Sequence, residues 1–354
     1  MKKICLSAYC CMNFGDDLFV KTLVRRYPDT IFFMNIDNKS RAAFRNEINI
    51  VYPSQIERLC VKVLCKLRII KKIDAEIYHV RRADGYVKIG GSIFIETAVV
   101  AKKYVEQYNE NSFFIGPNFG PFQSRAYVER VRLRLANVKD CCFRDSYSYK
   151  LFQDLSNVRY APDVLFSLST GLDRVEGRYL GISVILLDNR EGLSQISDEY
   201  YATISDACNE CRHMNIPVRL FAFCKREGDA DAMKKILSYT DHPEEIDTCV
   251  YEGDTEIFMA QLNECRWLLA TRLHSMILGW VLGKKVLPIV YSLKQTHILE
   301  DMNYCGHLWD IHSHQKYDSV KLLEDCLGNI DMDIAKYAQD SERQFEALDE
   351  FLRQ

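Results

Sequence analysis

Short runs of apolar residues alternate along the chain with longer stretches in which apolar residues recur at helical spacing. This alternation predicts parallel strands joined by helices that cover the faces of a sheet. In the first half we expect strands at residues 3–8, 30–34, 49–51, 85–89, 112–116 and 140–143. The helices expected between and after them lie at residues 17–26, 56–72, 96–109, 126–137 and 146–155.

A polar stretch at residues 169–178, with Ser, Thr and two glycines, interrupts the pattern and indicates a linker. The pattern then restarts, with strands expected at 179–186, 217–223, 266–270 and 286–290 and helices at 198–214, 229–239, 255–263 and 274–282. We therefore expect an α/β protein of two doubly wound Rossmann-like domains, 1–170 and 171–330, in a GT-B-like arrangement with a cleft between them. A last helix at 331–354 is expected to return to the first domain.

The composition is that of an ordinary globular protein, with 48% hydrophobic and 27% charged residues among 354. A net charge of −3 gives no reason to expect nucleic acid as a partner. The 14 cysteines are scattered, often inside apolar runs, and there is no run of about 18 apolar residues that would span a membrane. Asn13, Asp16 and Asp17 end the apolar start of the chain too early for a signal peptide. We expect a reduced, cytoplasmic protein.

One expected helix, at residues 56–72, is rich in both basic and apolar side chains. Its basic residues are Arg58, Lys62, Lys66, Arg68, Lys71 and Lys72, interleaved with Leu59, Val63, Leu64, Leu67 and Ile70. Two interpretations stay open: an ordinary packed helix with a solvated charged face, or a peripheral contact with the inner face of a membrane through anionic lipid.

The loop after the first expected strand combines an amide, a glycine and two carboxylates: Asn13, Gly15, Asp16 and Asp17. Ligands of doubly wound sheets bind beyond the carboxyl ends of the strands, so we expect this loop to face a ligand. Aspartate at the start of a helix is also a common N-cap. The local sequence leaves the helix cap and the functional carboxylate equally open.

Further polar loops follow strands of the first half. Gly90, Gly91 and Ser92 form one, where a glycine pair lets a ligand or a facing domain approach the backbone closely. Residues 116–122, with two glycines and two prolines, predict a rigid loop. Arg144 follows the next strand and suits an anion, although an arginine next to an aspartate is more often structural. The sequence contains no dinucleotide fingerprint and no P-loop.

The most informative cluster follows an apolar strand that ends at residue 270. Thr271 can cap a helix that opens with Arg272, Leu273, His274 and Ser275. The unpaired N–H groups of a helix start suit a phosphate or carboxylate, and Arg272 adds a planar, permanently charged fork. His274 can exchange protons near neutral pH, although a lone histidine is more often packed against a sheet. Its place two residues after Arg272, on a strand-to-helix turn, favours a functional role.

Two groups have the residue types of a metal site but not its pattern. Cys208 and Cys211 are spaced as in a zinc motif, but no second pair follows, and their helix places them on a core stripe. An expected loop gathers three histidines, with Asp310 as the one carboxylate nearby: His307, His312 and His314. We expect neither a metal nor a cofactor.

Taken together, these motifs resemble the polysaccharide pyruvyl transferase family across nearly the whole chain. The matching elements, in the family's order, are Asn13-x-Gly15-Asp16, Gly90-Gly91-Ser92, Gly116-Pro117 through Pro121-Phe122, Arg144-Asp145-x-x-Ser148, Asp163 and Arg272-Leu273-His274-Ser275. The second of these departs from many relatives, which have a third glycine. The resemblance implies a GT-B-like fold and assigns Arg272 and His274 to the donor site.

Members of this family move the enolpyruvyl part of phosphoenolpyruvate onto two hydroxyls of a sugar and leave a cyclic ketal. The resemblance thus implies a transferase of cell-surface polysaccharide biosynthesis, as for exopolysaccharide or capsule. Its co-substrate would be phosphoenolpyruvate, held by the second domain, and its acceptor a sugar such as galactose, or a lipid-linked oligosaccharide, held by the first. The donor's chemistry needs an acid for carbon and a base for hydroxyls, and we expect His274 and Asp16 in these roles. The residues expected around the donor are Arg272, Leu273, Ser275, Lys294 and Arg226.

Two other functions stay open. A GT-B-type glycosyltransferase would use Arg272 on the diphosphate of a nucleotide sugar. An inactive relative would only bind glycan or a partner in its synthesis, and the intact pair of Arg272 and His274 argues against it.

Overall fold

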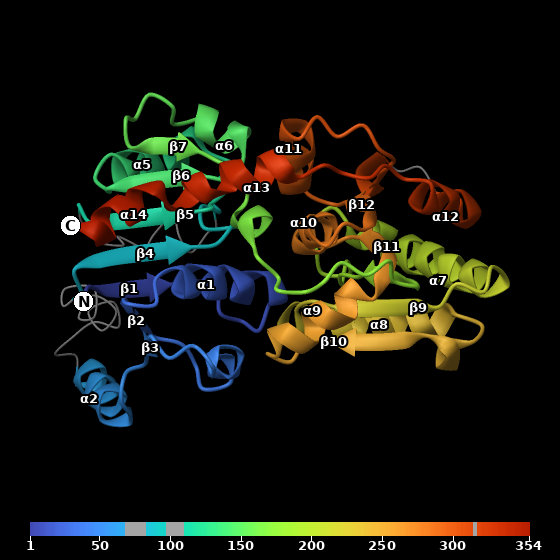
Figure 1. Ribbon diagram of the computed structural model, residues 1–354, viewed down its shortest axis with the longest axis horizontal. Coiled ribbons are helices and arrows are strands. Elements are labelled where there is room, and N and C mark those ends of the chain that lie inside the picture. The colour runs from blue at the N-terminus through green and yellow to red at the C-terminus, as the bar shows by residue number, and fades with distance from the viewer. Residues whose placement is uncertain (68–82, 97–109, 314–316) are drawn as a thin grey trace. The chain divides into compact units, whose positions relative to one another are not determined.

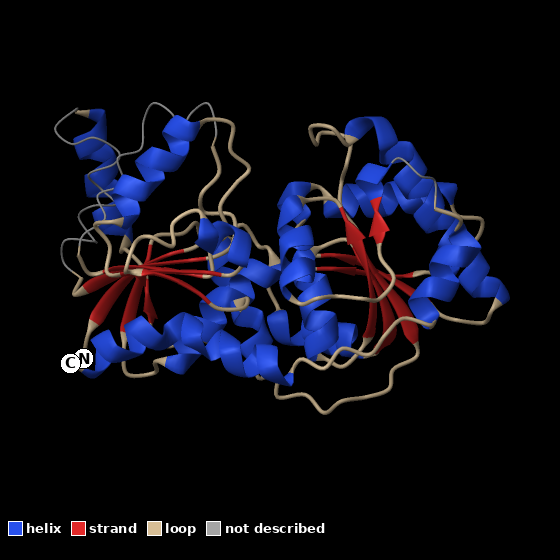
Figure 2. Ribbon diagram, turned by 90° about the horizontal axis from the view of Figure 1, so that it is seen from above, coloured by secondary structure: helices blue, strands red, loops and turns tan. Residues whose placement is uncertain are grey.

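The computed structural model describes residues 1–67, 83–96, 110–313 and 317–354 of the chain. Its contacts divide the chain into two compact units, drawn in Figure 1. Unit 1 comprises Met1–Cys10, Phe19–Val164 and Gln339–Gln354, and unit 2 comprises Cys11–Leu18 and Leu165–Ala338. Each unit contains one parallel sheet with helices on both of its faces (Figure 2). The α/β class and the two parallel sheets expected from the sequence are confirmed.

Unit 1 is built on a seven-stranded sheet in the order β3-β2-β1-β4-β5-β6-β7. Its strands are β1 (Lys3–Ser7), β2 (Ile31–Met34), β3 (Ile50–Val51), β4 (Gly85–Ile89), β5 (Ser112–Ile115), β6 (Asp140–Phe143) and β7 (Val158–Tyr160). The helices described up to residue 167 are α1 (Phe14–Arg26), η1 (Ser40–Phe44), α2 (Gln55–Lys66), α5 (Arg125–Leu135), α6 (Ser146–Lys150) and η2 (Val164–Ser167). The start of α1 and all but the first residue of η2 belong to unit 2. The strand β7 escapes the hydrophobic pattern because it has only 3 residues. Of the helices expected at 56–72 and 96–109, the parts at 68–72 and 97–109 lie outside the described residues.

One face of the unit 1 sheet is packed with aromatic rings. Phe143 of β6 stacks on Phe152 at 5.7 Å between ring centroids, and Phe119 meets Phe152 edge-on at 5.0 Å. The central strands β5 and β6 are buried along their whole length, as expected for a parallel sheet covered on both faces.

The C-terminal segment is three short helices, so the single helix expected at 331–354 is wrong. These are α13 (Ala335–Ser341), η7 (Glu342–Phe345) and α14 (Glu346–Arg353). The break turns the side chain of Gln344 into unit 1, where it is 1% exposed. Its amide oxygen accepts from the N–H of Gly116 at 2.9 Å, and its nitrogen donates to the carbonyls of Ala161 and Pro162 at 2.7 and 3.0 Å. The chain therefore gives up helical regularity there to satisfy buried backbone groups beyond the ends of β5 and β7.

Unit 2 is built on a six-stranded parallel sheet in the order β10-β9-β8-β11-β12-β13. Its strands are β8 (Tyr179–Ser183), β9 (Val218–Ala222), β10 (Asp247–Val250), β11 (Cys265–Ala270), β12 (Lys285–Val290) and β13 (Trp309–Asp310). Its α-helices are α7 (Ser197–His213), α8 (Asp229–Tyr239), α9 (Thr255–Asn263), α10 (Leu273–Val281), α11 (Leu293–Asp301) and α12 (Ser319–Leu327). Its described 3-10 helices are η3 (Ser194–Ile196), η4 (Lys225–Glu227), η5 (Pro243–Glu245) and η6 (Ile311–Ser313). The pattern predicted the four central strands, whereas the edge strands β10 and β13 and the helices α11 and α12 were not expected.

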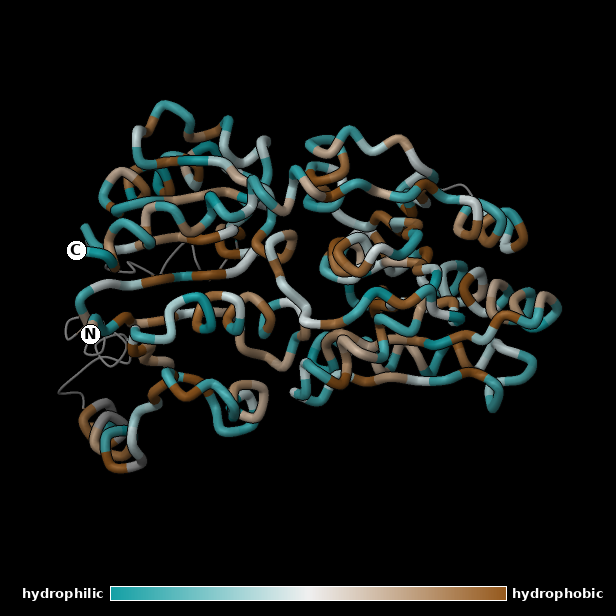
Figure 3. Tube along the Cα trace, in the orientation of Figure 1, coloured by the Kyte–Doolittle hydropathy of each residue, from teal (hydrophilic) through white to brown (hydrophobic). Residues whose placement is uncertain are grey.

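In unit 2, as in unit 1, the core is formed by buried apolar residues of the strands. Leu180, Leu269 and Leu287 on adjacent strands belong to one buried cluster with residues of α7, α8 and α12. In Figure 3 the apolar colour recurs along the strands, whereas a helix such as α2 carries apolar and polar positions in turn. Within the described ranges, no helix combines the length and the apolar character needed to cross a bilayer.

The division by contacts differs from the expected domain boundary in one informative place. The loop at Cys11–Leu18 belongs to unit 2 rather than to the unit that contains β1. Phe14 explains this, because its ring packs against Phe223, Tyr251 and Phe258 at centroid distances of 5.4, 5.3 and 4.5 Å. Its N–H also donates to the carbonyl of Phe223 at 3.0 Å. Residues that motif analysis placed in the first domain thus join the site of unit 2.

Candidate functional site

Charged and polar side chains gather after four adjacent strands of unit 2. Arg190 follows β8, Glu227 and Asp229 follow β9, Arg272 follows β11, and Tyr291 and Lys294 follow β12. Because these strands are parallel, their carboxyl ends lie at the same edge of the sheet, which is where doubly wound folds bind ligands.

Arg272 is at the centre of this group and is already paired with two carboxylates. Its Nε donates to Asp229 Oδ2 at 3.0 Å, its Nη2 donates to Asp229 Oδ1, and its Nη1 donates to Glu227 Oε2 at 2.5 Å. The residue is 7% exposed, and its backbone N–H donates to Ser183 Oγ. Burial alone would lower the pKa of Arg272, but the charges of Asp229 and Glu227 outweigh it and raise the pKa well above the usual value. The guanidinium is therefore fixed in direction and permanently charged.

Sequence analysis did not identify the two carboxylates. Gly228 between them has a φ of +86°, a left-handed conformation that lets Glu227 and Asp229 present their oxygens to one guanidinium. Burial raises the pKa of Asp229 despite the opposing effect of Arg272. For Glu227, burial is outweighed by Arg272 and Lys294, and its pKa is lowered. The signal that could have found them is a pair of acids flanking a glycine soon after a strand. Arg226, which we expected to assist, is exposed.

His274 lies in the first turn of α10, against the start of α1. A Cβ placed on Gly15 would overlap the imidazole, so glycine at this position makes room for His274. The start of α1 is held by Asn13, whose Oδ1 accepts from the N–H of Gly15 at 3.2 Å and whose backbone bridges to Cys224. The structure thus brings together two motifs that are about 260 residues apart in the sequence.

The neighbours of His274 differ from what the sequence predicts in one respect. Thr271 does not cap α10: its hydroxyl pairs with that of Tyr200 at 2.9 Å, and Arg272 occupies the N-cap position. Leu273 and Ser275 both have buried side chains.

The two aspartates of the first loop lie in the first turn of α1 but differ in burial. Asp17 is 1% exposed, and its Oδ2 accepts from the hydroxyl of Tyr251 at 2.8 Å. Burial, together with Asp17, raises the pKa of Tyr251, which therefore stays protonated as the donor of this bond. Asp16 is half-buried and is the more accessible carboxylate of the pair. Since the side chain of Asn13 meets the helix start, a capping role does not have to fall to either aspartate.

Sequence analysis placed Lys294 and Arg272 near the donor but did not identify Tyr291, whose ring Lys294 approaches, or Arg190. The guanidinium carbon of Arg190 lies 5.1 Å from the centroid of the Tyr291 ring, and Lys294 Nζ lies 5.7 Å from it. Arg190 also pairs with Glu227 at 3.4 Å, which connects this group to Arg272. Burial would raise the pKa of Tyr291, yet Lys294, Arg272 and Arg190 outweigh it and lower the pKa.

The glycine loop and the arginine of unit 1 form a cluster of their own. The guanidinium of Arg144, 3% exposed, pairs with Asp163 at 2.9 Å and donates to Asn118 Oδ1 at 2.7 Å. A Cβ on Gly91 would overlap this guanidinium. At Gly91 the close approach is therefore that of the Arg144 side chain, rather than that of the ligand or facing domain expected from the sequence. Ser92 is exposed, and Asp145, the acid next to Arg144, accepts from the N–H of Ser148 at the start of α6.

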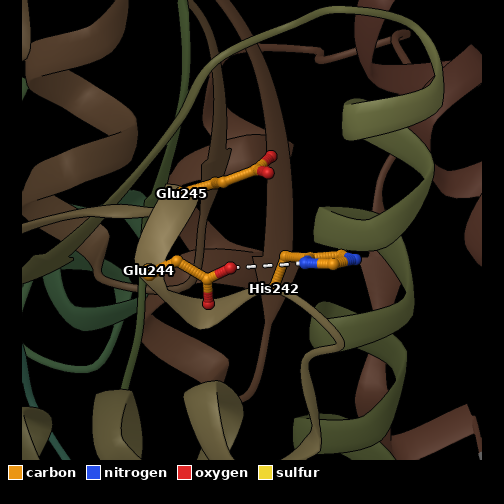
Figure 4. Close-up of side chains that lie close together, drawn as sticks. All are labelled: His242, Glu244 and Glu245. Carbon is orange, nitrogen blue, oxygen red and sulfur yellow. Dashed lines mark hydrogen bonds and ion pairs between the residues drawn. The ribbon is translucent and has the colours of Figure 1, made fainter.

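One group of described residues could bind a metal ion, but its side chains already form ion pairs. His242, Glu244 and Glu245 are close enough together to hold an ion, on a surface turn of unit 2 (Figure 4). Glu245, however, pairs with Arg212 at 2.9 Å, and His242 with Glu244 at 3.3 Å.

The other groups that resembled metal sites are otherwise engaged. Cys208 and Cys211 are buried core residues of α7, and burial raises the pKa of the Cys211 thiol to about 12. His307 lies 3.4 Å from Asp325, and His312 lies 2.9 Å from the carbonyl of Tyr291. His314 lies outside the described residues. Thirteen of the 14 cysteines are free thiols in the structure.

Solved structures of similar fold support the architecture. The UDP-GlcNAc 2-epimerase from Methanocaldococcus jannaschii has a TM-score of 0.58 at 12% identity, with 98% of this chain and 99% of that chain covered. Anabaena Alr3699/HepE in complex with UDP-glucose has a TM-score of 0.58 at 11% identity, with both chains fully covered. The S. aureus MnaA–UDP structure has a TM-score of 0.56 at 11% identity, covering 98% and 94%. At these identities the likeness establishes the GT-B-type fold alone.

Sequence comparison is more specific. No curated protein matches the chain. A sequence model of the polysaccharide pyruvyl transferase family matches residues 13–292, a span that begins at the loop beside His274 and ends just after Tyr291. The chain belongs to the polysaccharide pyruvyl transferase family.

Proposed function

We propose that this protein is a ketal pyruvyl transferase. It moves the enolpyruvyl part of phosphoenolpyruvate onto two hydroxyls of a sugar, such as a galactose, in the synthesis of a cell-surface polysaccharide. Family membership supports the reaction class. The observation that carries the proposal is the packing of His274 against Gly15, which brings an imidazole to a loop that bears a carboxylate, two residues from the buried Arg272.

The donor carries a carboxylate and a phosphate, and both need cations or N–H groups. Arg272 pairs with two carboxylates that differ in exposure. The side chain of Asp229 is fully buried, whereas that of Glu227 is 27% exposed. A donor oxyanion takes the place of Glu227 on Nη1, while Asp229 keeps the guanidinium in position. Leu273 and Ser275 contribute backbone N–H groups at the start of α10, and Lys294 adds a charge beside Tyr291. Arg226 assists from the surface.

In the reaction, two hydroxyls of the sugar each lose a proton. The methylene carbon and the phosphate each gain one, so the protons balance. His274 protonates the methylene carbon, which becomes a methyl group. The oxygen of the first sugar hydroxyl bonds to the adjacent carbon and gives its proton to Asp16. Phosphate leaves with the electrons of its bond to that carbon, and the second hydroxyl closes the ketal as it loses its proton. One hydroxyl proton replaces the one that His274 supplied, and the other leaves on phosphate.

The test is a transfer assay in which the protein receives phosphoenolpyruvate and a panel of lipid-linked or synthetic galactosides. The expected result is an acceptor heavier by one pyruvyl ketal and one phosphate released per ketal. The same panel with nucleotide sugars tests the GT-B-type glycosyltransferase. Sugar transfer without ketal formation would overturn the proposal, and acceptor binding with neither reaction would favour a non-catalytic glycan-binding relative.

The proposal assigns the donor to unit 2 and the acceptor to unit 1. Hydrogen exchange measured with each substrate alone tests this assignment. Protection by phosphoenolpyruvate is expected around α10, and protection by the acceptor is expected in unit 1. The reverse pattern would contradict it.

We also propose that the protein is cytoplasmic and rests on anionic lipid through α2. The apolar side chains of Ile56, Leu59 and Val63 are exposed on this helix, and Lys66 adds positive charge. Arg58 contributes less, because it donates to the carbonyl of Ile36. Arg68, Lys71 and Lys72 lie outside the described residues.

Co-sedimentation with anionic vesicles at low salt should fall in a Leu59→Glu, Val63→Glu variant. Leu133→Glu is a matched control, because Leu133 is an exposed apolar residue on α5. Equal sedimentation of all three proteins, or none by the wild type, would remove the proposal.

A further inference from the structure

Tyr291 differs in its electrostatic environment from the other described tyrosines whose pKa is shifted. Burial raises the pKa of each of the other described tyrosines with a resolved shift: Tyr27, Tyr52, Tyr200, Tyr201, Tyr251, Tyr304, Tyr317 and Tyr337. Tyr291 is as buried as many of them, at 6% exposed, yet its pKa is lowered. Its surroundings must therefore stabilise the phenolate by more than burial destabilises it.

The groups that face Tyr291 come from five elements of unit 2. Arg190 lies after β8, and Lys294 in α11, with their charges 5.1 and 5.7 Å from the ring centroid. Arg272 after β11 adds a third positive charge, and Glu227 of η4 opposes them. His312 of η6 contacts the backbone carbonyl of Tyr291. The cluster around this phenol thus has three cations and two carboxylates, since Asp229 pairs with Arg272 as well.

The backbone of Tyr291 is held in a fixed position relative to Arg272. Gln295, which is fully buried, accepts from the N–H of Tyr291 at 3.1 Å through Oε1. Its Nε2 donates to the carbonyls of Thr271 and Ile289, each at 3.0 Å. One side-chain amide therefore ties the turn after β12 to the turn that carries Arg272. The backbone that carries the phenol is therefore fixed in position by this amide.

We propose that Tyr291 is the second proton acceptor of the site, taking the proton of the sugar hydroxyl that closes the ketal. The inference rests on the proposed function, because ketal formation deprotonates two hydroxyls and Asp16 accounts for one. The phenolate oxygen takes the proton as the hydroxyl oxygen forms its bond to carbon and phosphate leaves. The phenol then passes this proton to the departing phosphate and returns to the phenolate.

Ultraviolet titration of the tyrosinate band tests the first half of the proposal without substrate. The difference between wild type and Tyr291→Phe isolates one phenol, and its midpoint should lie below about 10. In Arg190→Gln and Lys294→Gln backgrounds the same difference should move to higher pH. Tyr239→Phe, which removes an exposed phenol of α8, is the matched control. A midpoint for Tyr291 at or above the usual value would overturn the inference.

The rate of transfer as a function of pH tests the second half. In the wild type, turnover should rise with pH until Tyr291 is deprotonated, and Arg190→Gln should shift that limb to higher pH. Tyr291→Phe should lose the limb and roughly 10²-fold or more in turnover, while donor binding measured by calorimetry is retained. If the wild type forms the ketal and Tyr291→Phe is equally active, the role of Tyr291 is overturned but the proposed function is not. A wild type that forms no ketal with any acceptor would overturn the proposed function, and this role with it.

Discussion

Each unit contains a buried arginine that follows a strand and pairs with a carboxylate. In unit 1 the positive charge of Arg144 is matched by Asp163, the neutral Asn118 completes the cluster, and Gly91 covers the guanidinium. In unit 2 Arg272 faces two carboxylates, one of them partly exposed, and two more cations lie nearby. In the unit 1 cluster the charge of the arginine is neutralised and buried. In the unit 2 cluster some charged groups are accessible, and a ligand can change how they pair. That difference, rather than the presence of an arginine, separates a structural pair from a candidate site.

The largest expected effect belongs to His274, which has no counterpart in the unit 1 cluster. In His274→Gln turnover should fall by roughly 10²–10⁴ while donor affinity and melting temperature stay near wild type. Steady-state kinetics, calorimetry and thermal melts measure the three quantities. His213→Gln, at an exposed position in α7, is the control. A well-folded His274→Gln enzyme with near wild-type turnover would end its assignment as the acid.

Arginine-to-lysine substitutions compare the two clusters directly. Arg272→Lys keeps the charge but loses the fork, so donor affinity should weaken by about one to two decades, since a hydrogen bond to a charged group contributes about 1.5–3 kcal/mol. Arg144→Lys should leave donor affinity unchanged and lower the free energy of unfolding by about 1–3 kcal/mol, because a buried acceptor loses its donor. Binding by calorimetry and denaturant unfolding distinguish them. If both variants lose stability while donor affinity is unchanged in both, the proposed difference between the two arginines is wrong.

Two glycine substitutions sharpen the comparison further. Gly15→Ala and Gly91→Ala each add a methyl group that would overlap a side chain, His274 in the first case and Arg144 in the second. Each should cost about 1–3 kcal/mol of folding free energy through overpacking. Turnover per folded molecule should fall in Gly15→Ala and stay unchanged in Gly91→Ala. Equal turnover in both would show that the position of His274 is not important for the reaction.

The smallest expected effect concerns the ion pairs that hold α14 to the rest of unit 1. Burial would raise the pKa of Asp349, but its bonds with Arg26 and Tyr27 outweigh it and hold the pKa below the usual value. A carboxyl with a lowered pKa stabilises the fold at pH above its unfolded pKa of about 4, and this stabilisation is lost as the pH falls through the folded pKa.

Asp349→Asn should therefore be less stable at pH 7 by about 1 kcal/mol, and this difference should vanish in acid. Thermal melts across a pH series measure it, with the exposed Asp331→Asn as the control. A difference that stays constant with pH would mean that the charge of Asp349 does not contribute.

Long central elements were predictable because their signal is local. Buried strands such as β5, β6 and β12 appear as apolar runs, and α7 and α8 show helical spacing. The short strands β7 and β13 carry no such signal, because 3 and 2 residues are too few for a period. The break at Gln344 also escaped prediction, since what favours it is a set of carbonyls and N–H groups elsewhere in the chain.

For the candidate site, the sequence by itself determined the residue types and the family: Arg272 and His274 on a strand-to-helix turn, and a loop with Gly15 and Asp16. Only the tertiary structure decided what each of them meets. It paired Arg272 with Glu227 and Asp229, set His274 against Gly15, and surrounded Tyr291 with cations. The physical reason is that a motif records local backbone geometry, whereas the state of a buried charge depends on every segment that packs around it. In a parallel sheet those segments follow different strands, far apart in sequence.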